Sequence, residues 1–112
     1  MFCESTAEGW LDADAACLAS GYELATIGDA AENTWVVATA ATYGGGNWWI
    51  GLNDIAVEGT FEWSSGDPVV YTNWSSAEPN GGASSDCVHL KASRGTWADH
   101  NCTTAMRYVC EE

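Results

Sequence analysis

The chain has 112 residues, which fits one domain that is small enough to benefit from covalent or metal constraints. Sixteen acidic residues against three basic ones give a net charge of −13, which disfavours nucleic acid and anionic membranes and favours cations as partners. Seven Trp, four Tyr and two Phe need burial, so the composition predicts a globular domain and not an acidic disordered tail. Because no apolar run approaches about eighteen residues, we expect no insertion into a membrane.

Two helices are predicted in the first half of the chain. Apolar residues recur at spacings of three and four over residues 10–18, and Gly21 is placed to end this helix. Asp29 is a candidate cap for a second helix, because Glu32 follows three residues later and completes a capping pattern. This second helix should continue to the glycines at 44–46, which break it.

The remaining regular structure is predicted as strands. A mostly apolar run after the glycines indicates a buried central strand, and three shorter segments carry strand signals. The four predicted strands cover residues 47–52, 60–63, 87–90 and 106–110. Between them, residues 64–86 contain both prolines and little periodicity, and such a long loop in a compact domain is expected to be functional or held by a ligand. The alternative is a floppy surface insertion, which Tyr71 and Trp74 disfavour as potential anchors.

The cysteines favour disulfides over a metal or redox site. There is no Cys-x-x-Cys pair and there are only two histidines, which argues against zinc and against a thioredoxin-like function. Disulfides imply an oxidising compartment, so we expect an extracellular protein, either secreted or on the cell surface. Cys17, Cys87, Cys102 and Cys110 allow three pairings, with Cys3 left over.

The tripeptide Glu78-Pro79-Asn80 is the most informative short segment of the chain. It places a carboxylate and a carboxamide on either side of a stiff proline. Calcium prefers several oxygen ligands of this kind and tolerates irregular geometry. The alternative is an ordinary turn, because proline and asparagine are common loop residues. The surrounding sequence has to decide between these two interpretations.

Taken together, the chain resembles the C-type lectin-like domain from about Trp10 to its end. Ten segments match in the family's order and approximate spacing. In chain order they are Trp10-x-x-Ala13-x-x-x-Cys17, Gly21-x-x-Leu24-Ala25-x-Ile27, Glu32-x-x-Trp35, Trp49-Ile50-Gly51-Leu52, Phe61-x-Trp63-Ser64-x-Gly66, Tyr71-x-Asn73-Trp74, Glu78-Pro79-Asn80, Asp86-Cys87-Val88, Trp97-x-Asp99-x-x-Cys102 and Tyr108-Val109-Cys110-Glu111. One such segment would be weak evidence, but the ordered set makes coincidence remote.

The resemblance implies a single α+β domain over residues 1–112. In this fold two helices flank small, mostly antiparallel sheets, and a long loop region carries the ligand site. The family pattern selects the disulfides Cys17–Cys110 and Cys87–Cys102, and it leaves Cys3 free or intermolecular. It also implies a binding domain without catalysis, in agreement with the lack of a nucleophile and base constellation in the sequence.

The resemblance assigns a calcium and sugar site to the loop region. In sugar-binding relatives the proline of Glu-Pro-Asn is cis, and Glu78 and Asn80 turn toward one calcium ion. Asp99 would be a further metal ligand, Asp86 or solvent would fill the remaining positions, and two neighbouring sugar hydroxyls would coordinate the ion directly. The order Glu-Pro-Asn implies mannose-type sugars, namely mannose, glucose, N-acetylglucosamine and fucose. His100 is a candidate sugar contact, with a solvated loop histidine as the alternative.

Asp54 and Glu58 match carboxylates that hold an auxiliary calcium in some relatives, with Asp86 as their third partner. Their alternative interpretation is that of solvated acids on a turn. The chain departs from the family at Ala98, where Asn is usual, and at Ser85, where Glu is usual. Fewer charged ligands predict weaker calcium binding. A second hypothesis is therefore a calcium-independent domain that binds a protein or another surface ligand through the loop region.

Glycans are the expected partners of this domain. Because single sugar sites are weak, useful avidity would need an oligomer or a multidomain parent.

Six tryptophans match core positions of the family, while Trp48 is expected to be exposed beside the glycines. The six are Trp10, Trp35, Trp49, Trp63, Trp74 and Trp97.

Overall fold

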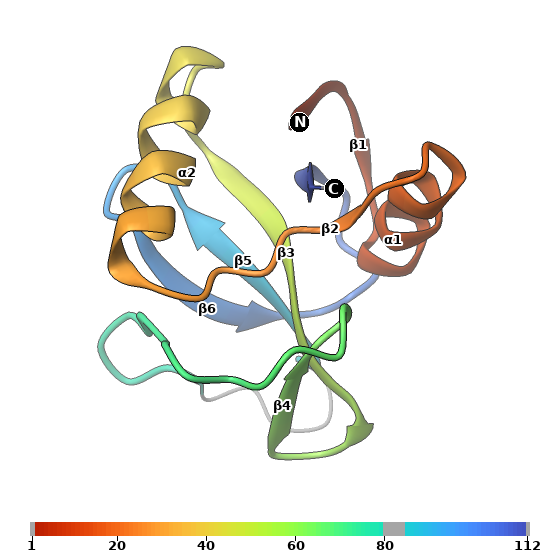
Figure 1. Ribbon diagram of the computed structural model, residues 1–112, viewed down its shortest axis with the longest axis vertical. Coiled ribbons are helices and arrows are strands. Elements are labelled where there is room, and N and C mark those ends of the chain that lie inside the picture. Colours follow the sequence, from red (N-terminus) through yellow and green to blue (C-terminus); the bar gives the residue numbers. More distant parts are fainter. Residues whose placement is uncertain (1, 80–84, 112) are drawn as a thin grey trace.

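The computed structural model describes residues 2–79 and 85–111, with side chains from residue 7 onward (Figure 1). Within these ranges no helix is long and apolar enough to cross a membrane. The two helices are α1 (Trp10–Ala19) and α2 (Ala30–Thr42). The strands are β1 (Phe2–Glu8), β2 (Glu23–Leu24), β3 (Asn47–Val57), β4 (Thr60–Trp63), β5 (Cys87–Lys91), β6 (Thr96–His100) and β7 (Met106–Glu111).

The strands form a mixed sheet whose main order is β1-β7-β3-β5-β6. Two short strands lie off this path, since β2 pairs with β7 and β4 pairs with β3. Among the described pairings β3 and β7 run parallel, and the others are antiparallel. In Figure 1 the two helices stand on opposite sides of the long central strand β3. This confirms the expected α+β fold, with two helices flanking a largely antiparallel sheet.

Local chemistry explains both predicted helices. The Asp29 side chain accepts a hydrogen bond from the Glu32 N–H at 2.8 Å, and Glu32 in turn accepts one from the Gly28 N–H at 3.1 Å. These bonds satisfy backbone donors that the first turn of α2 leaves without partners. The helix α1 ends at Ala19, and Gly21 follows with a φ of +80°, which glycine adopts without strain. Both helix predictions are confirmed.

The strand predictions were right for four strands and missed three. The strand β2 is only two residues long, β1 is largely polar, and β6 alternates large and small residues around an aspartate, so none of them shows a clear apolar pattern. The central strand also extends beyond the predicted segment, as far as Val57. Gly51 is required within it, because an added Cβ would lie 2.7 Å from the Ser64 hydroxyl and 3.1 Å from the Ala25 carbonyl oxygen.

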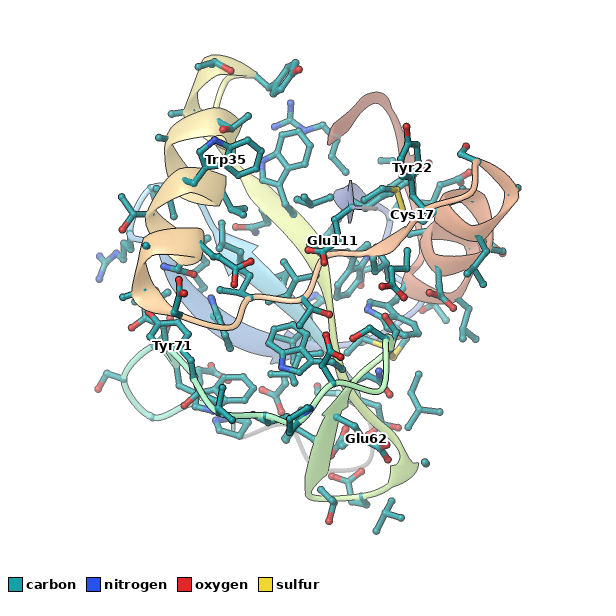
Figure 2. All side chains as sticks on the ribbon, viewed as in Figure 1. Cys17, Tyr22, Trp35, Glu62, Tyr71 and Glu111 are labelled. Carbon is teal, nitrogen blue, oxygen red and sulfur yellow. A yellow bond between two sulfur atoms is a disulfide. The ribbon has the colours of Figure 1, made fainter. Side chains whose placement is uncertain are left out.

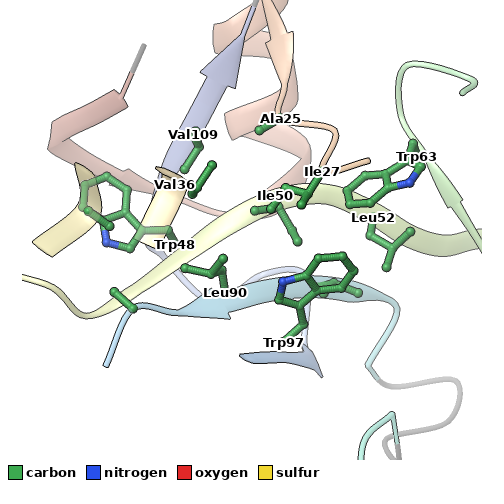
Figure 3. Packing of buried hydrophobic residues seen from close by; sticks show 13 residues of the cluster. Ala25, Ile27, Val36, Trp48, Ile50, Leu52, Trp63, Leu90, Trp97 and Val109 are labelled. Carbon is green, nitrogen blue, oxygen red and sulfur yellow. The ribbon is translucent and has the colours of Figure 1, made fainter. Parts of the chain in front are cut away.

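The main core lies between α2 and the sheet (Figure 3). Trp48 and Trp97 are fully buried there, and Val36 reaches them from α2. The expected exposure of Trp48 was therefore wrong: its indole N–H donates to Gly45 O at 2.9 Å, and the Arg107 guanidinium lies 4.3 Å from its ring. The expected burial of Trp35 was also wrong. The buried face of α2 contains Val36 and the residues about one turn before and after it, and Trp35 lies outside this face and is 59% exposed.

A second apolar cluster joins α1 to the sheet through the disulfide Cys17–Cys110. The other disulfide, Cys87–Cys102, ties β5 to the segment after β6. Both pairings are those that the family resemblance selected. Bridges that close loops of these lengths contribute on the order of 3 to 5 kcal/mol each in the chain-entropy model. Cys3 lies in β1, and because its side chain is outside the described part, its unpaired state stays a prediction.

Candidate metal and ligand site

The long loop is attached to the outer strand β6. The Trp97 N–H donates to Asn73 O at 2.8 Å, and the Ser75 N–H donates to Trp97 O at 2.8 Å, so Trp74 forms an isolated bridge to Trp97. The rings of Tyr71 and Trp74 also pack edge to face on Trp97, with centroid distances of 5.7 and 6.1 Å. In the described part of this loop, the predicted anchors are therefore present, and the floppy alternative is wrong.

Glu78 is brought against Asp99 at the end of this attached segment. The peptide bond between Glu78 and Pro79 is cis, as the resemblance implied, and the Glu78 N–H donates to Ser75 O at 3.0 Å. Asp99 lies on β6 and is 8% exposed. Burial raises the pKa of Glu78, and a hydrogen bond with the Asp99 carboxyl and the charge of Asp99 raise it further. Asn80, the third member of the tripeptide, lies outside the described residues.

A second acidic group lies where β3 turns into β4. Oxygen atoms of Asp54, Glu58 and Asp86 lie within 4.8 Å of one another. The backbone fixes two of these residues, since the Asp54 N–H donates to Asp86 O at 2.9 Å and the Gly59 N–H donates to Asp54 Oδ2 at 2.7 Å. The pKa of Glu58 is raised to about 7, chiefly by a hydrogen bond with the Asp86 carboxyl. Burial raises the pKa of Asp54.

Both groups contain buried oxygens that lack a hydrogen-bond partner. These are Glu78 Oε1 in the first group and Asp54 Oδ1 and Asp86 Oδ1 in the second. Buried acceptors are normally satisfied, and crowded carboxylates repel one another, so each group is costly as it stands. A hard divalent cation would satisfy these oxygens and relieve the repulsion, because it prefers carboxylate ligands. The donor set in both groups therefore fits such an ion.

The structure brings Asp86 together with Asp54 and Glu58, which is one of the two groups to which the sequence assigned it. Side chains alternate between the faces of a strand, so His100 and Asp99 point to opposite faces of β6. The exposed His100 has its ring 5.5 Å from the ring of the buried His89, and its role as a sugar contact or a solvated histidine stays a prediction.

The structure also shows where Ala98 and Ser85 lie, the two residues that depart from the family pattern. Ala98 is 3% exposed and pairs with His89 on the neighbouring strand, where its methyl group offers no ligand atom. Ser85 lies just before the acidic residue Asp86 and is half-buried. Asp99 is therefore the carboxylate that the structure shows directly beside Glu78.

Comparison with known proteins agrees with this architecture. The Lectin C-type domain family matches residues 6–112. The chain is 34% identical over 104 residues to C-type mannose receptor 2 of Mus musculus, a match that covers 92% of this chain and 7% of the receptor. It is 37% identical over 106 residues to lectin BRA-3 of Megabalanus rosa, covering 91% of this chain and 64% of that lectin.

Solved structures give the same result. Human lithostathine superimposes with a TM-score of 0.90 at 32% identity, covering 98% of this chain and 87% of that one. A calcium-independent type II antifreeze protein superimposes with a TM-score of 0.89 at 30% identity, covering 98% and 82% of the two chains.

Fold, disulfides and carboxylate groups define a small disulfide-bonded binding domain without an enzymatic function. The chain belongs to the Lectin C-type domain family. It spans only 7% of the length of the mannose receptors that it matches, and therefore corresponds to a small part of those proteins.

Proposed function

We propose that this domain is a calcium-dependent carbohydrate-binding module that recognises mannose-type sugars. The observation that carries the proposal is the pair of carboxyls of Glu78 and Asp99, with Glu78 Oε1 buried and without a hydrogen-bond partner. A bound cation would neutralise this pair. Because the tripeptide order Glu78-Pro79-Asn80 matches that of mannose-type lectins, mannose, glucose, N-acetylglucosamine and fucose are the proposed ligands.

In this proposal Glu78, Asn80 and Asp99 hold one calcium ion. When bound, calcium supplies open coordination positions for two neighbouring sugar hydroxyls. The carboxylates of Glu78 and Asp99 would accept hydrogen bonds from the sugar hydroxyls, and the Asn80 amide would donate a hydrogen bond to a hydroxyl oxygen. A sugar whose neighbouring hydroxyls differ in orientation makes fewer of these bonds. The protein groups thus set the specificity, while the ion contributes affinity.

Asp54, Glu58 and Asp86 are proposed to hold an auxiliary calcium. Asp54 lies on β3 and Asp86 immediately precedes β5, so an ion between them would join the two ends of the segment that carries the sugar site. Its role would be to fix the loop and not to contact sugar. Asp86 then acts only in this second group, and solvent completes the first one.

Retention on mannose-agarose tests the main proposal. The protein should bind in millimolar calcium and elute with a chelator, and Glu78→Gln should abolish retention because it removes a charged ligand at the ion. Glu62→Gln is a matched control, since Glu62 is an exposed acid on β4. Flow-through of the unmodified protein in calcium, together with no calorimetric heat on adding monosaccharides, would exclude the lectin function.

A double exchange tests the proposed specificity. Glu78→Gln combined with Asn80→Asp reverses the order of acceptor and donor, and it should shift preference from mannose toward galactose. The measurement is how well free mannose and free galactose compete with retention on a mannose resin and on a galactose resin. If mannose remains the better competitor for a variant that still binds, the sugar occupies another site.

A calcium-independent domain that binds a protein or another surface ligand is the second candidate. Ala98 favours it, because the family's usual amide ligand is replaced by a buried methyl group. A calcium-independent antifreeze protein of 30% identity has the same fold, so this fold does not require the ion. Calcium titration by calorimetry separates the two functions: no calcium binding up to about 10 mM, far above the range of extracellular sites, would favour the second.

We also propose an extracellular location, secreted or on the cell surface. Two disulfides support it, since such bonds persist in oxidising compartments. Glycan partners would be bound with useful avidity only when several copies act together, in an oligomer or in a multidomain parent.

A further inference from the structure

A groove lies between α2 and the paired strands β2 and β7, apart from both carboxylate groups. Its volume is about 400 Å³, within the usual range of ligand sites. The residues that define it are Tyr22, Glu32, Trp35, Val36, Val109 and Glu111. Figure 2 shows Glu111 between Trp35 and Tyr22, while Glu62 on β4 lies at the opposite end of the view.

The groove has an apolar floor and an aromatic rim. Val36 is 5% exposed and Val109 is 2% exposed, so both present only their outermost atoms to it. Trp35 stands above them from α2 and is 59% exposed. An indole with this much exposed surface beside a concave apolar floor is typical of residues that contact a partner.

Two carboxylates make the groove acidic. Glu111 is half-buried, and its Oε1 accepts a hydrogen bond from the Thr26 N–H at 2.9 Å. Glu32 is held by the Gly28 N–H at 3.1 Å. Burial raises the pKa of Glu111, and the charges of Glu32, Glu23 and Asp67 add to this shift. The described residues that line the groove include no lysine or arginine. An approaching cation would therefore find uncompensated negative potential.

We propose that this groove binds a basic segment of a partner protein, in which an arginine or lysine stands next to an apolar residue. The alkyl stem would lie on Val36 and Val109, and the cationic group would reach Glu111 and Glu32. Trp35 would cover the side chain and contact the cation through its ring. The net charge of −13 also favours a basic partner.

Other kinds of ligand fit the residues that line the groove less well. A neutral sugar would leave the two carboxylates uncompensated, and a purely apolar segment would bury them at a cost. A single inorganic ion is too small for a groove of about 400 Å³. The binding site is separate from Glu78 and Asp99, so binding of the basic segment should not require calcium and does not depend on the proposed lectin function.

The test uses the whole chain in a chelating buffer with the capped tripeptide acetyl-Leu-Arg-Leu-amide as the probe. Two-dimensional 15N NMR reports the indole N–H signals of the seven tryptophans. The Trp35 signal should shift in a saturable way, and the affinity should fall at high salt because the contact is ionic. The matched peptide acetyl-Leu-Glu-Leu-amide should cause no saturable shift. Equal binding of both peptides, or binding that mannose displaces, would overturn the proposal.

Variants locate the binding to the groove. Glu111→Gln keeps an oxygen that can accept from Thr26, and it should weaken binding about tenfold because a charged contact is lost. Trp35→Ala removes the reporter indole, so its binding is followed through the backbone amide signals of the groove, and it should be about three- to fivefold weaker. Trp35 is 59% exposed, so this exchange should leave the domain folded. Glu62→Gln and Leu18→Ala are exposed controls away from the groove and should change nothing. Unchanged affinity in both groove variants, with native spectra, would refute the assignment.

Discussion

The tryptophans of the buried framework and the carboxylates of the acidic loop end differ in whether their polar atoms have hydrogen-bond partners. In the framework four tryptophans bury their rings and still donate their indole N–H groups at 2.8 to 2.9 Å. The donors and acceptors are Trp10 to Ile50 O, Trp48 to Gly45 O, Trp49 to Glu8 O and Trp97 to Asn33 Oδ1. At the loop end, buried oxygens of Asp54, Glu78 and Asp86 have no partner.

This difference separates the parts that stabilise the fold from the parts that we propose to bind an ion. A buried donor that finds its acceptor within the chain makes the core specific without outside help. A buried carboxylate oxygen without a donor lowers the stability of the folded chain until something binds it. Mutations in the first region should therefore lower stability in every buffer, whereas mutations in the second should act through the ion.

The largest effect is expected at Trp97. It is fully buried, it contacts the rings of Trp63, Tyr71 and Trp74, and its N–H bonds to Asn33. Trp97→Ala should lower the free energy of unfolding by about 3 to 5 kcal/mol. Urea unfolding followed by circular dichroism measures this. Trp35→Ala is the control and should cost less than about 1 kcal/mol. Equal losses would mean that the exposed tryptophan also belongs to the framework.

Removal of the disulfide that joins the two regions should have the next largest effect. Cys87 and Cys102 are 15 residues apart, so replacing both by alanine should cost about 3 kcal/mol in the chain-entropy model. The midpoint of thermal unfolding should fall correspondingly in calcium and in chelator. A much larger loss in calcium alone would show that this bridge serves the ion site more than the framework.

The effect of Asp54→Asn on the free energy of unfolding should change sign when calcium is added. Without the ion the variant should be more stable by about 1 kcal/mol, because burial, and to a smaller extent the charge of Asp86, disfavours the Asp54 carboxylate and raises its pKa. With calcium at about ten times its dissociation constant, the unmodified protein should gain about 1.4 kcal/mol that the variant lacks. Thermal unfolding of both proteins, with calcium and with a chelator, measures these two differences in stability. Equal calcium stabilisation of the two proteins would exclude Asp54 as a ligand.

His89 should make a smaller, pH-dependent contribution. It is 3% exposed with both ring nitrogens unpartnered, and its pKa is lowered to about 4 by burial and by the charges of His100 and Lys91, against the opposing effect of Asp99. Between about pH 6.5 and pH 4, His89 therefore binds a proton in the unfolded chain but stays neutral in the folded chain. The stability associated with neutral His89 is complete above about pH 6.5 and is lost as the pH falls toward 4.

His89→Phe should remove this loss. In chelator at about pH 5 the variant should retain about 2 kcal/mol of stability that the unmodified protein has lost. The measurement is the urea midpoint as a function of pH for both proteins. His100→Gln replaces an exposed histidine and should leave most of the dependence in place. Parallel curves for the unmodified protein and His89→Phe would show that other groups cause the loss.

Sequence patterns predicted the helices well, because their periodicity and the Asp29 cap are local signals. The disulfide pairing came from the family resemblance, since spacing alone left three choices. The exposure of Trp35 and the burial of Trp48 were predicted wrongly. Both depend on how α2 rotates over the sheet and on where Arg107 lies, and neither is visible in a local pattern. The groove beside Glu111 was missed for the same reason, because three separate segments form it.

The sequence named candidate site residues but could not show how they lie relative to one another. The contact between Glu78 and Asp99 and the grouping of Asp54 with Glu58 follow the family pattern. The position of Asp86 was left open between two groups, because the sequence shows that it precedes β5 but not which way its carboxylate turns.

The bonds between the loop and β6 have one more consequence. The strand β6 ends the main sheet order, and an outermost strand normally exposes unpaired backbone groups that recruit strands from other molecules. Here Asn73 and Ser75 occupy the outer backbone groups of Trp97. The segment that carries the candidate ligand site therefore also covers the edge of the sheet, and it protects a tryptophan-rich domain against edge-to-edge aggregation.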